Sequence, residues 1–118
     1  MTTAPRPIDC CEPSNQVVPL RGDERQRIVA LFKALGDGTR LEVFRLIAGQ
    51  ESGICVCDIV DRFDVSQPTI SHHLKVLRDT ELITVSRRGN WAFYAANRQT
   101  LRLISGFVAE SHVPSPIG

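Results

Sequence analysis

Hydrophobic residues recur every three or four positions in several stretches of the chain, which is the spacing of one buried helix face. The helices predicted along the chain span residues 23–35, 39–49, 55–63, 66–82 and 98–110. Between the last two, residues 82–96 alternate instead, with β-branched and aromatic residues on both sides of the sequence RRGN. Because alternation is the period of a strand, this segment predicts a two-stranded hairpin with Gly89-Asn90 at or beside its turn.

Polar residues, glycine and proline mark where the predicted helices begin and end. We expect Asp23 to cap the first helix, which the sequence GDG at residues 36–38 ends;. Gly49 ends the second helix. Ser66 can cap the fourth, and Pro68 stands in its first turn, where a missing amide donor costs nothing. Three helices, a turn, a fourth helix and a β-ribbon predict a winged helix-turn-helix, a mostly α fold with a β-hairpin wing.

The fourth helix has the features of a DNA recognition helix. Ile70, Leu74 and Leu77 form its buried stripe, and short hydrogen-bonding side chains occupy its N-terminal part, the end that enters the major groove;. Such side chains can reach base edges or phosphates. The predicted DNA contacts, on this helix and at the wing tip, are Ser66, Gln67, Thr69, Ser71, His72, His73, Lys75, Arg87 and Arg88. A helix of this composition is often only a solvated helix, but the short helix before it and the wing after it favour DNA binding.

Length and composition limit the class of protein. The chain has 118 residues, enough for one compact domain, and its 42% hydrophobic content is typical of a soluble protein;. We expect an irregular N-terminal arm over residues 1–22, the winged helix over 23–111 and a tail over 112–118. The net charge of +1 means that any attraction to DNA comes from a local patch;. No apolar run approaches the roughly 20 residues of a membrane span, and the N-terminus does not resemble a signal peptide, which predicts a cytoplasmic protein.

Four cysteines form two tight pairs, Cys10-Cys11 in the arm and Cys55-x-Cys57 at the start of the third helix. Reduced clusters of this kind more often bind metal or react than form structural disulfides. Adjacent cysteines are too close for an ordinary disulfide, yet both can reach one soft ion. In a regular helix, positions i and i+2 face opposite sides. Cys55 and Cys57 can therefore share an ion only if Cys55 lies at an irregular first turn; otherwise we expect Cys57 to pack in the interior.

Other interpretations of the cysteines remain open. They can be buried structural thiols, or a thiol-oxidation sensor in which Cys10 or Cys11 oxidises onto Cys55. A winged helix that binds a protein partner instead of an operator is a further alternative. The sequence has no Cys-x-x-Cys motif, no Cys-x5-Arg loop of a thiol-dependent arsenate reductase, no Ser/His/Asp constellation and no phosphate-binding glycine loop. We therefore predict that the protein is not an enzyme.

The segments LFKALGDGTRLEVFRLI, CVCDIVDRFDVSQPTISHHLKVLRDTELI and RRGNWAFYA resemble the ArsR/SmtB family of metal-responsive bacterial repressors. The resemblance covers residues 24–110, and SQPTISHHLKVL is its most specific segment; GDG and DTEL depart slightly from the family pattern. It implies a homodimer built by the first and last helices, with Leu101, Ile104 and Val108 as dimer contacts or as intramolecular core. Such a dimer binds two-fold symmetric operator DNA and releases it when metal binds.

The resemblance also bears on the inducer. The sequence CVCD stands where arsenic- and cadmium/lead-sensing members carry thiolates, and in the latter group the N-terminal arm completes the site. As(III) or Sb(III) would use three sulfurs, most simply Cys10, Cys11 and Cys55, whereas Cd(II), Pb(II) or Zn(II) would prefer all four, including Cys57. The short bite of adjacent cysteines suits pyramidal arsenic and favours arsenite. A second family site, formed by Asp and His on the last helix, is not supported, because His112 lies beyond that helix.

Overall fold

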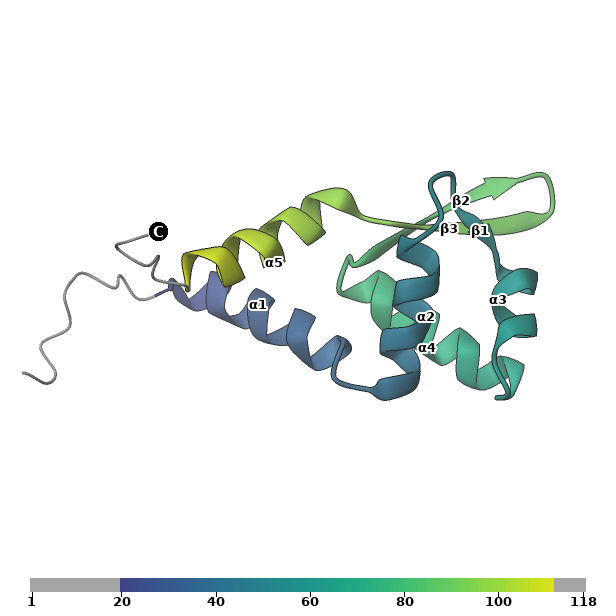
Figure 1. Cartoon of the computed structure of the whole chain (residues 1–118), viewed down its shortest axis with the longest axis horizontal. Coiled ribbons are helices and arrows are strands. Elements are labelled where there is room, and N and C mark those ends of the chain that lie inside the picture. The colour runs from purple at the N-terminus through teal and green to yellow at the C-terminus, as the bar shows by residue number, and fades with distance from the viewer. Residues whose placement is uncertain (1–19, 112–118) are drawn as a thin grey trace, which may run out of the picture.

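The computed structural model describes residues 20–111 and has the predicted mostly α architecture with a β-hairpin wing (Figure 1). In chain order its elements are α1 (Gly22–Ala34), α2 (Gly38–Ala48), β1 (Ile54–Cys55), α3 (Val56–Arg62), α4 (Gln67–Asp79), β2 (Ile83–Arg88), β3 (Trp91–Ala96) and α5 (Arg98–Glu110). Every helix and the hairpin predicted from the sequence are present. The arm cysteines Cys10 and Cys11 and the tail residue His112 lie outside the described residues.

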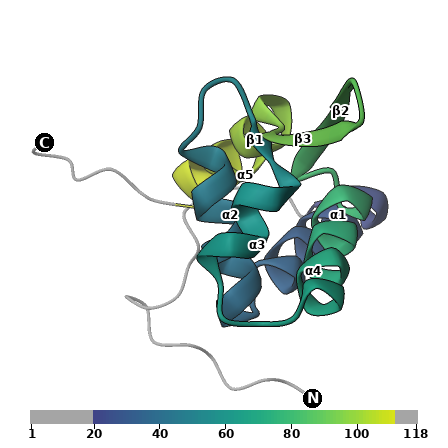
Figure 2. The same ribbon diagram turned by 90° about the vertical axis from the view of Figure 1, so that its right-hand side faces the viewer.

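Two groups of elements make up the described chain. Helices α2, α3 and α4 pack together beneath a small sheet, while α1 and α5 lie side by side at the other end (Figures 1 and 2). The core between α2, α3, α4 and the sheet is mostly aliphatic, and its fully buried members include Val43, Ile47, Ile59, Ile70, Leu77 and Leu82. Burying such side chains supplies most of the favourable free energy of folding. The core therefore fixes α4 against α2 and α3, and it leaves the opposite face of α4 exposed.

The sheet has three antiparallel strands in the order β1-β3-β2. The predicted hairpin is confirmed, with Ile83 opposite Ala96 and Arg88 opposite Trp91. Gly89 takes a positive φ of 66° in its turn, a conformation that costs glycine little;. Strand β1 is new relative to the sequence prediction: Cys55, expected to be helical, instead pairs with Phe93 of β3. A two-residue strand is too short to show any periodicity.

The helix starts agree only partly with the predictions. Ser66 caps α4, and its hydroxyl accepts a hydrogen bond from the Thr69 amide at 3.3 Å. Asp23 does not cap α1: the helix begins one residue earlier, at Gly22, with Arg21 at the N-cap position and no side-chain cap. Asp23 lies in the first turn, where its carboxylate suits the positive end of the helix dipole;.

Helix α4 ends at Asp79, earlier than the predicted residue 82. The reason is Glu81, which adopts a left-handed φ of 64°. Its conformation reverses the chain so that the Leu82 amide donates to the Leu77 carbonyl at 2.9 Å, a helix-ending bond;. A non-glycine residue is uncommon at such a φ. Glu81 also forms an ion pair with Arg27 of α1 at 3.1 Å, which links this turn to the first helix.

Candidate DNA-binding and thiol site

Helix α4 presents a polar surface at its N-terminal end. Of the predicted DNA contacts on this helix, Ser66, Gln67, Thr69, Ser71, His72 and Lys75 are exposed. The hydroxyls of Ser66 and Thr69 lie 2.9 Å apart, so they orient one another at the start of the helix. Lys75 forms an exposed ion pair with Asp79 at 3.0 Å, an interaction weak enough to exchange for a phosphate;. The wing lies on the same side of the molecule as α4 (Figure 2).

The expected placement of His73 on this exposed face is wrong. His73 is only 7% exposed, and it faces the start of α2. Arg40 Nη1 lies 3.2 Å from His73 Nδ1, and Asp37 Oδ1 lies 4.0 Å from Nε2. Because a guanidinium can only donate, His73 Nδ1 accepts, and the ring is neutral with its proton on the side of Asp37. His73 therefore ties the recognition helix to α2 and does not face solvent.

Arg40 extends this connection to α1. Its backbone amide donates to the capping carboxylate of Asp37 at 2.9 Å, and its Nε donates to the carbonyl of Ala34 at the end of α1. The hydrogen bond from the Arg40 amide is the main reason why the pKa of Asp37 is lowered. Burial lowers the pKa of His73, and Arg40 and His72 add to this effect, while Asp37 opposes it.

The lowered pKa of His73 predicts a loss of stability in mild acid. An unfolded histidine titrates near pH 6.5, so below about that pH the unfolded chain binds a proton that the folded chain resists. The free energy of unfolding should then fall as the pH drops from 7 to 5, by at most about 1.4 kcal/mol per pH unit from this group. Urea unfolding at a series of pH values measures it. His73→Gln should flatten the dependence, whereas His72→Gln, which removes only the smallest of the contributions to the His73 pKa, should change it much less.

The wing carries two arginines, and they differ in their contacts with the rest of the protein. Both Arg87 and Arg88 are exposed at the end of β2. The Arg88 guanidinium lies 4.3 Å from the centroid of the Phe93 ring, and its Nη2 donates to the carbonyl of Ser52 at 2.7 Å. Arg87 makes neither contact, and because successive strand residues face opposite ways it points to the other face of the sheet;. Arg87 is thus the wing arginine better placed to meet a phosphate.

The two described cysteines lie together at the start of α3. Cys55 is the N-cap residue, with extended φ and ψ of −69° and 143°, and Cys57 is in the first turn. Their sulfurs are 2.8 Å apart, and either thiol can donate to the other. The irregular first turn required for a shared ion is therefore present. The expectation that Cys57 packs inside is wrong: Cys55 is buried by its pairing with β3, and Cys57 is exposed.

The thiol pair supplies part of a metal site. Within residues 20–111, no three His, Cys, Asp or Glu side chains are grouped so that they could hold an ion. Two thiols that converge on one point are nonetheless suitable donors for a soft ion, which binds thiolate sulfur strongly. The hydrogen bond with Cys55 is the main cause that raises the pKa of Cys57, so its thiol holds its proton more firmly than an isolated cysteine. Any further ligand must come from elsewhere, and Cys10 and Cys11 are the remaining cysteines of the chain.

A buried helical core, an exposed recognition helix and a flanking β-ribbon define a winged helix-turn-helix protein of the DNA-binding class. Residues 37–85 match the model of the family described as "Bacterial regulatory protein, arsR family". The chain belongs to this family, and it is a DNA-binding transcriptional regulator and not an enzyme. In the part of the chain that the structure describes, every helix is too short or too polar to cross a membrane.

Individual relatives support this assignment. The chain is 39% identical over 80 residues to the arsenical resistance operon repressor of Staphylococcus xylosus, an alignment that covers 68% of this chain and 75% of that protein. It is 39% identical over 79 residues to the repressor of the same name from Bacillus subtilis, covering 67% and 71%. Among solved structures, HlyU from Vibrio cholerae is 20% identical with a TM-score of 0.63, covering 78% of this chain and 98% of HlyU, which shows a shared fold.

Proposed function

We propose that the protein is a homodimeric repressor that binds a two-fold symmetric operator and releases it when As(III) or Sb(III) binds to its cysteine thiolates. The observation that supports the inducer is the convergence of the Cys55 and Cys57 sulfurs to 2.8 Å at the start of the helix before the recognition helix. The relatives named arsenical resistance operon repressors favour arsenic as the ion.

DNA recognition is assigned to α4 and the wing. Gln67, Ser71 and His72 are exposed at or near the end of α4 that enters a major groove, and Gln67 has the donor and acceptor that pair with adenine;. Arg87 would contact the backbone beside the groove. His73 is not included among these contacts, because it is buried.

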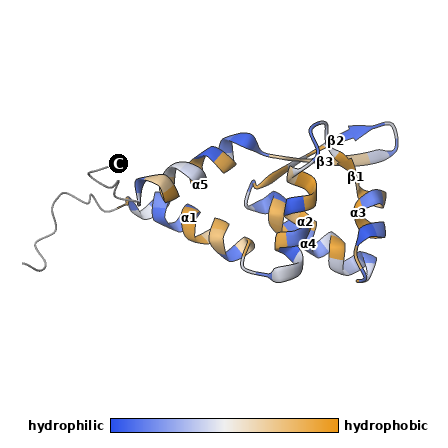
Figure 3. Cartoon of the chain, in the orientation of Figure 1, coloured by the Kyte–Doolittle hydropathy of each residue, from blue (hydrophilic) through white to orange (hydrophobic). Residues whose placement is uncertain are grey.

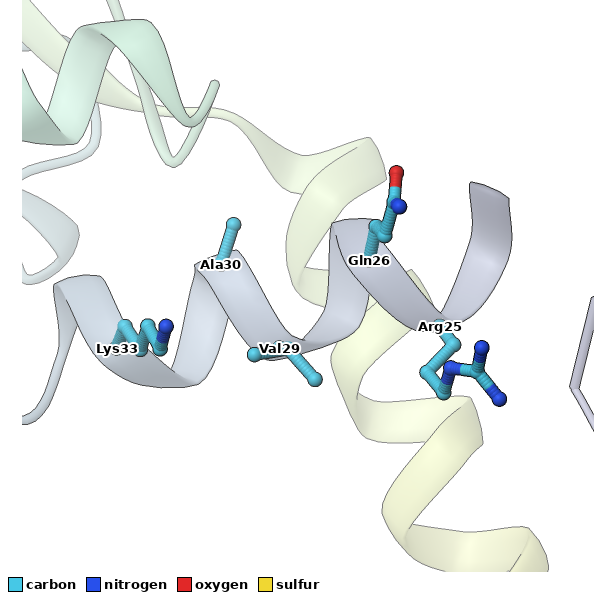
Figure 4. A pocket seen from close by; sticks show the side chains of 5 residues that line it. All are labelled: Arg25, Gln26, Val29, Ala30 and Lys33. Carbon is cyan, nitrogen blue, oxygen red and sulfur yellow. The ribbon is translucent and has the colours of Figure 1, made fainter. Parts of the chain in front are cut away.

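A second copy of the chain is the proposed partner of the α1 and α5 surface. Phe32 and Phe107 meet edge to face between the two helices, yet Val29, Phe32 and Val108 remain 45%, 45% and 53% exposed. Hydrophobic residues occur along both helices at the end away from the sheet (Figure 3). On α1 they border a shallow hollow lined by Arg25, Gln26, Val29, Ala30 and Lys33 (Figure 4). A two-fold dimer would cover this face and set two recognition helices about one DNA turn apart, roughly 34–36 Å.

The inducer would be held by Cys55, Cys57 and a third thiolate from Cys10 or Cys11, in the same or the other subunit. An ion held by both thiolates would change the separation of the two sulfurs, which is 2.8 Å in the structure, and would thereby shift the N-terminus of α3. This helix is joined to α4 by a short turn, residues 63–66, so a displacement of α3 changes the orientation of the recognition helix. Because both half-sites must be met together, a small displacement weakens binding at both.

Release of a labelled duplex tests the function. A duplex selected from random DNA by repeated binding to the protein would be followed by fluorescence anisotropy under reducing conditions. Near-stoichiometric release by arsenite supports the proposal. Release by cadmium that needs all four cysteines would assign the protein to the divalent-ion branch, and release only by peroxide would make the thiols an oxidation sensor. No selective enrichment of DNA would exclude an operator-binding repressor.

The pH dependence of inducer binding distinguishes the two kinds of ion. Uncharged arsenous acid and three thiols give a tris-thiolate and three waters, so no proton is released. A divalent cation displaces each thiol proton, and its apparent affinity should rise up to about tenfold per pH unit for each proton displaced. The raised pKa of Cys57 extends this rise to higher pH. Between pH 6.5 and 8.5 we therefore expect a nearly constant arsenite affinity and a steep increase for cadmium, measured by competition with a coloured chelator or dithiol.

The role of Arg87 predicts a change in salt dependence. Loss of one phosphate contact in each of two wings should reduce the slope of log K against log salt concentration by about 1.8. The affinity of Arg87→Gln for DNA would be measured between about 50 and 300 mM salt. Both selected and unrelated duplexes would be used. Arg45→Gln, which removes a charge from the exposed surface of α2, is the matched control. An unchanged slope for Arg87→Gln would contradict the assigned phosphate contact.

A further inference from the structure

Arg88 joins the wing to the segment that contains the thiol pair. It is the last residue of β2, and its side chain extends over Phe93 of the central strand to the carbonyl of Ser52, which precedes β1. Since the strand order is β1-β3-β2, this one side chain spans the sheet from one edge to the other.

Phe93 connects the same contact to the thiols. Phe93 lies opposite Cys55 in the pairing of β1 with β3. The residue whose ring contacts the Arg88 guanidinium is therefore the strand partner of the first cysteine. Cys55 in turn begins α3, and its sulfur contacts Cys57. A displacement of Cys55 would therefore reach Phe93 through the strand pairing and Arg88 through its contact with the Phe93 ring.

The loop before β1 is built closely against this contact. Gly53 has a positive φ of 96°, and a Cβ there would lie 3.3 Å from the Tyr94 carbonyl oxygen and 3.7 Å from Arg88 Nη2. The loop thus lies close against β3, and a side chain at position 53 would be strained by the positive φ and by the near approach of the Tyr94 carbonyl. By contrast, the Arg88 contact is exposed to solvent, where a phosphate competes well for a guanidinium;. The loop before β1 is therefore joined to the wing by a contact, from Arg88 to Ser52, that a movement near the thiol pair could break.

We propose that Arg88 is a positioning residue that couples the thiol pair to the wing: a ligand that bridges Cys55 and Cys57 alters the Arg88 contact with Ser52 and Phe93 and thereby moves the hairpin. This inference rests on the proposed function in assigning a ligand to the thiols, but it makes a separate claim about the route by which the ligand acts. Because coupling between two sites is reciprocal, DNA held by the wing affects the thiol pair in turn.

The single tryptophan of the chain reports on this coupling. Trp91 is 56% exposed at the wing tip and is the register partner of Arg88. A Cys10→Ser/Cys11→Ser background leaves only the described thiols. Phenylarsine oxide is the probe: its oxygen leaves as water with the two thiol protons, and arsenic forms one bond to each sulfur, with no change in oxidation state. Titration is followed by Trp91 emission in the free protein, without DNA.

We expect one equivalent of probe to change Trp91 emission in the parent protein. Arg88→Gln should lose at least about three quarters of that change while it binds one equivalent with unaltered melting temperature, and Arg87→Gln, its neighbour on the other face, should keep it. Phe93→Leu, which leaves the strand pairing in place, should reduce the response as well. An absent response in the parent protein, or an equal response in Arg88→Gln, would overturn the proposal.

A parallel measurement separates this inference from the proposed function. With the four cysteines intact, arsenite should weaken DNA binding by a factor in the ordinary range for coupled sites, about 5–150-fold, and Arg88→Gln should reduce this factor to less than about 3-fold. If arsenite fails to release DNA but the emission response depends on Arg88, the inducer assignment is wrong and the coupling stands. If arsenite releases DNA equally from the parent and Arg88→Gln, the function stands and the coupling is wrong.

Discussion

Replacement of Cys57 by serine should abolish the release of DNA by arsenite at near-stoichiometric concentrations. The exposed Cys57 sulfur lies 2.8 Å from Cys55, so the substitution removes one of the two thiolates that the described fold brings together. The loss should exceed the roughly 10–100-fold that removal of an outer-shell partner costs a metal site. DNA affinity without inducer should change by less than about twofold, because the side chain is exposed and remote from the core. Anisotropy titrations of the duplex complex with arsenite measure both quantities.

Asp58→Asn is the matched control for this variant. It changes the next residue on the same turn, which is also exposed, and it leaves both sulfurs in place. It should keep a release curve close to that of the parent protein. If Cys57→Ser released DNA normally, the trigonal set of Cys10, Cys11 and Cys55 expected from the sequence would be favoured instead. The two ligand sets are thus decided by one substitution.

The helices and the wing were predictable because local signals agree along most of the chain. Helical spacing, the Ser66 cap with Pro68 behind it, and alternation around Gly89 each point to the element that forms;. The same agreement explains why the core of α4 was identified correctly. Its members Ile70 and Leu77 lie on one helix face whatever the tertiary contacts are.

His73 shows where residue type misled the prediction. Positions 70, 73, 74 and 77 fall on a single helix face, so the spacing already places His73 on the buried stripe;. The polar character of the side chain suggested the opposite. What allows its burial is Arg40 with Asp37, partners more than thirty positions away that helix periodicity cannot identify.

The cysteines and Arg88 depend on contacts that are distant in the sequence. Whether Cys55 or Cys57 packs inside is decided by the pairing of Cys55 with Phe93, and β1 is too short to leave a pattern. The direction of Arg88 is decided by the Ser52 carbonyl in a loop thirty-six residues away. The glycine at position 53 was the available signal, since an isolated glycine beside a strand often marks a close approach of another chain segment;.

Val29→Glu should convert the protein to a monomer and weaken operator binding by about 100-fold or more, because two linked half-sites bind far more tightly than one. In the proposed dimer the second subunit would cover the new carboxylate and remove its charge from water, which costs free energy. In the monomer the same carboxylate is well tolerated. The side chain at position 29 is 45% exposed, so in the monomer the carboxylate stays in water.

Sedimentation equilibrium measures whether Val29→Glu is a monomer, and fluorescence anisotropy measures its affinity for the operator duplex. Val65→Glu, the same change at a valine that is 37% exposed in the turn between α3 and α4, should leave the dimer mass unchanged. Thermal unfolding should show that Val29→Glu remains folded, since the substituted side chain is 45% exposed and leaves the core intact. A Val29→Glu protein that stays dimeric would place the second copy on another surface. A monomer that kept full operator affinity would instead show that one recognition helix and its wing are sufficient, and the proposed release by displacement of paired half-sites would then be wrong.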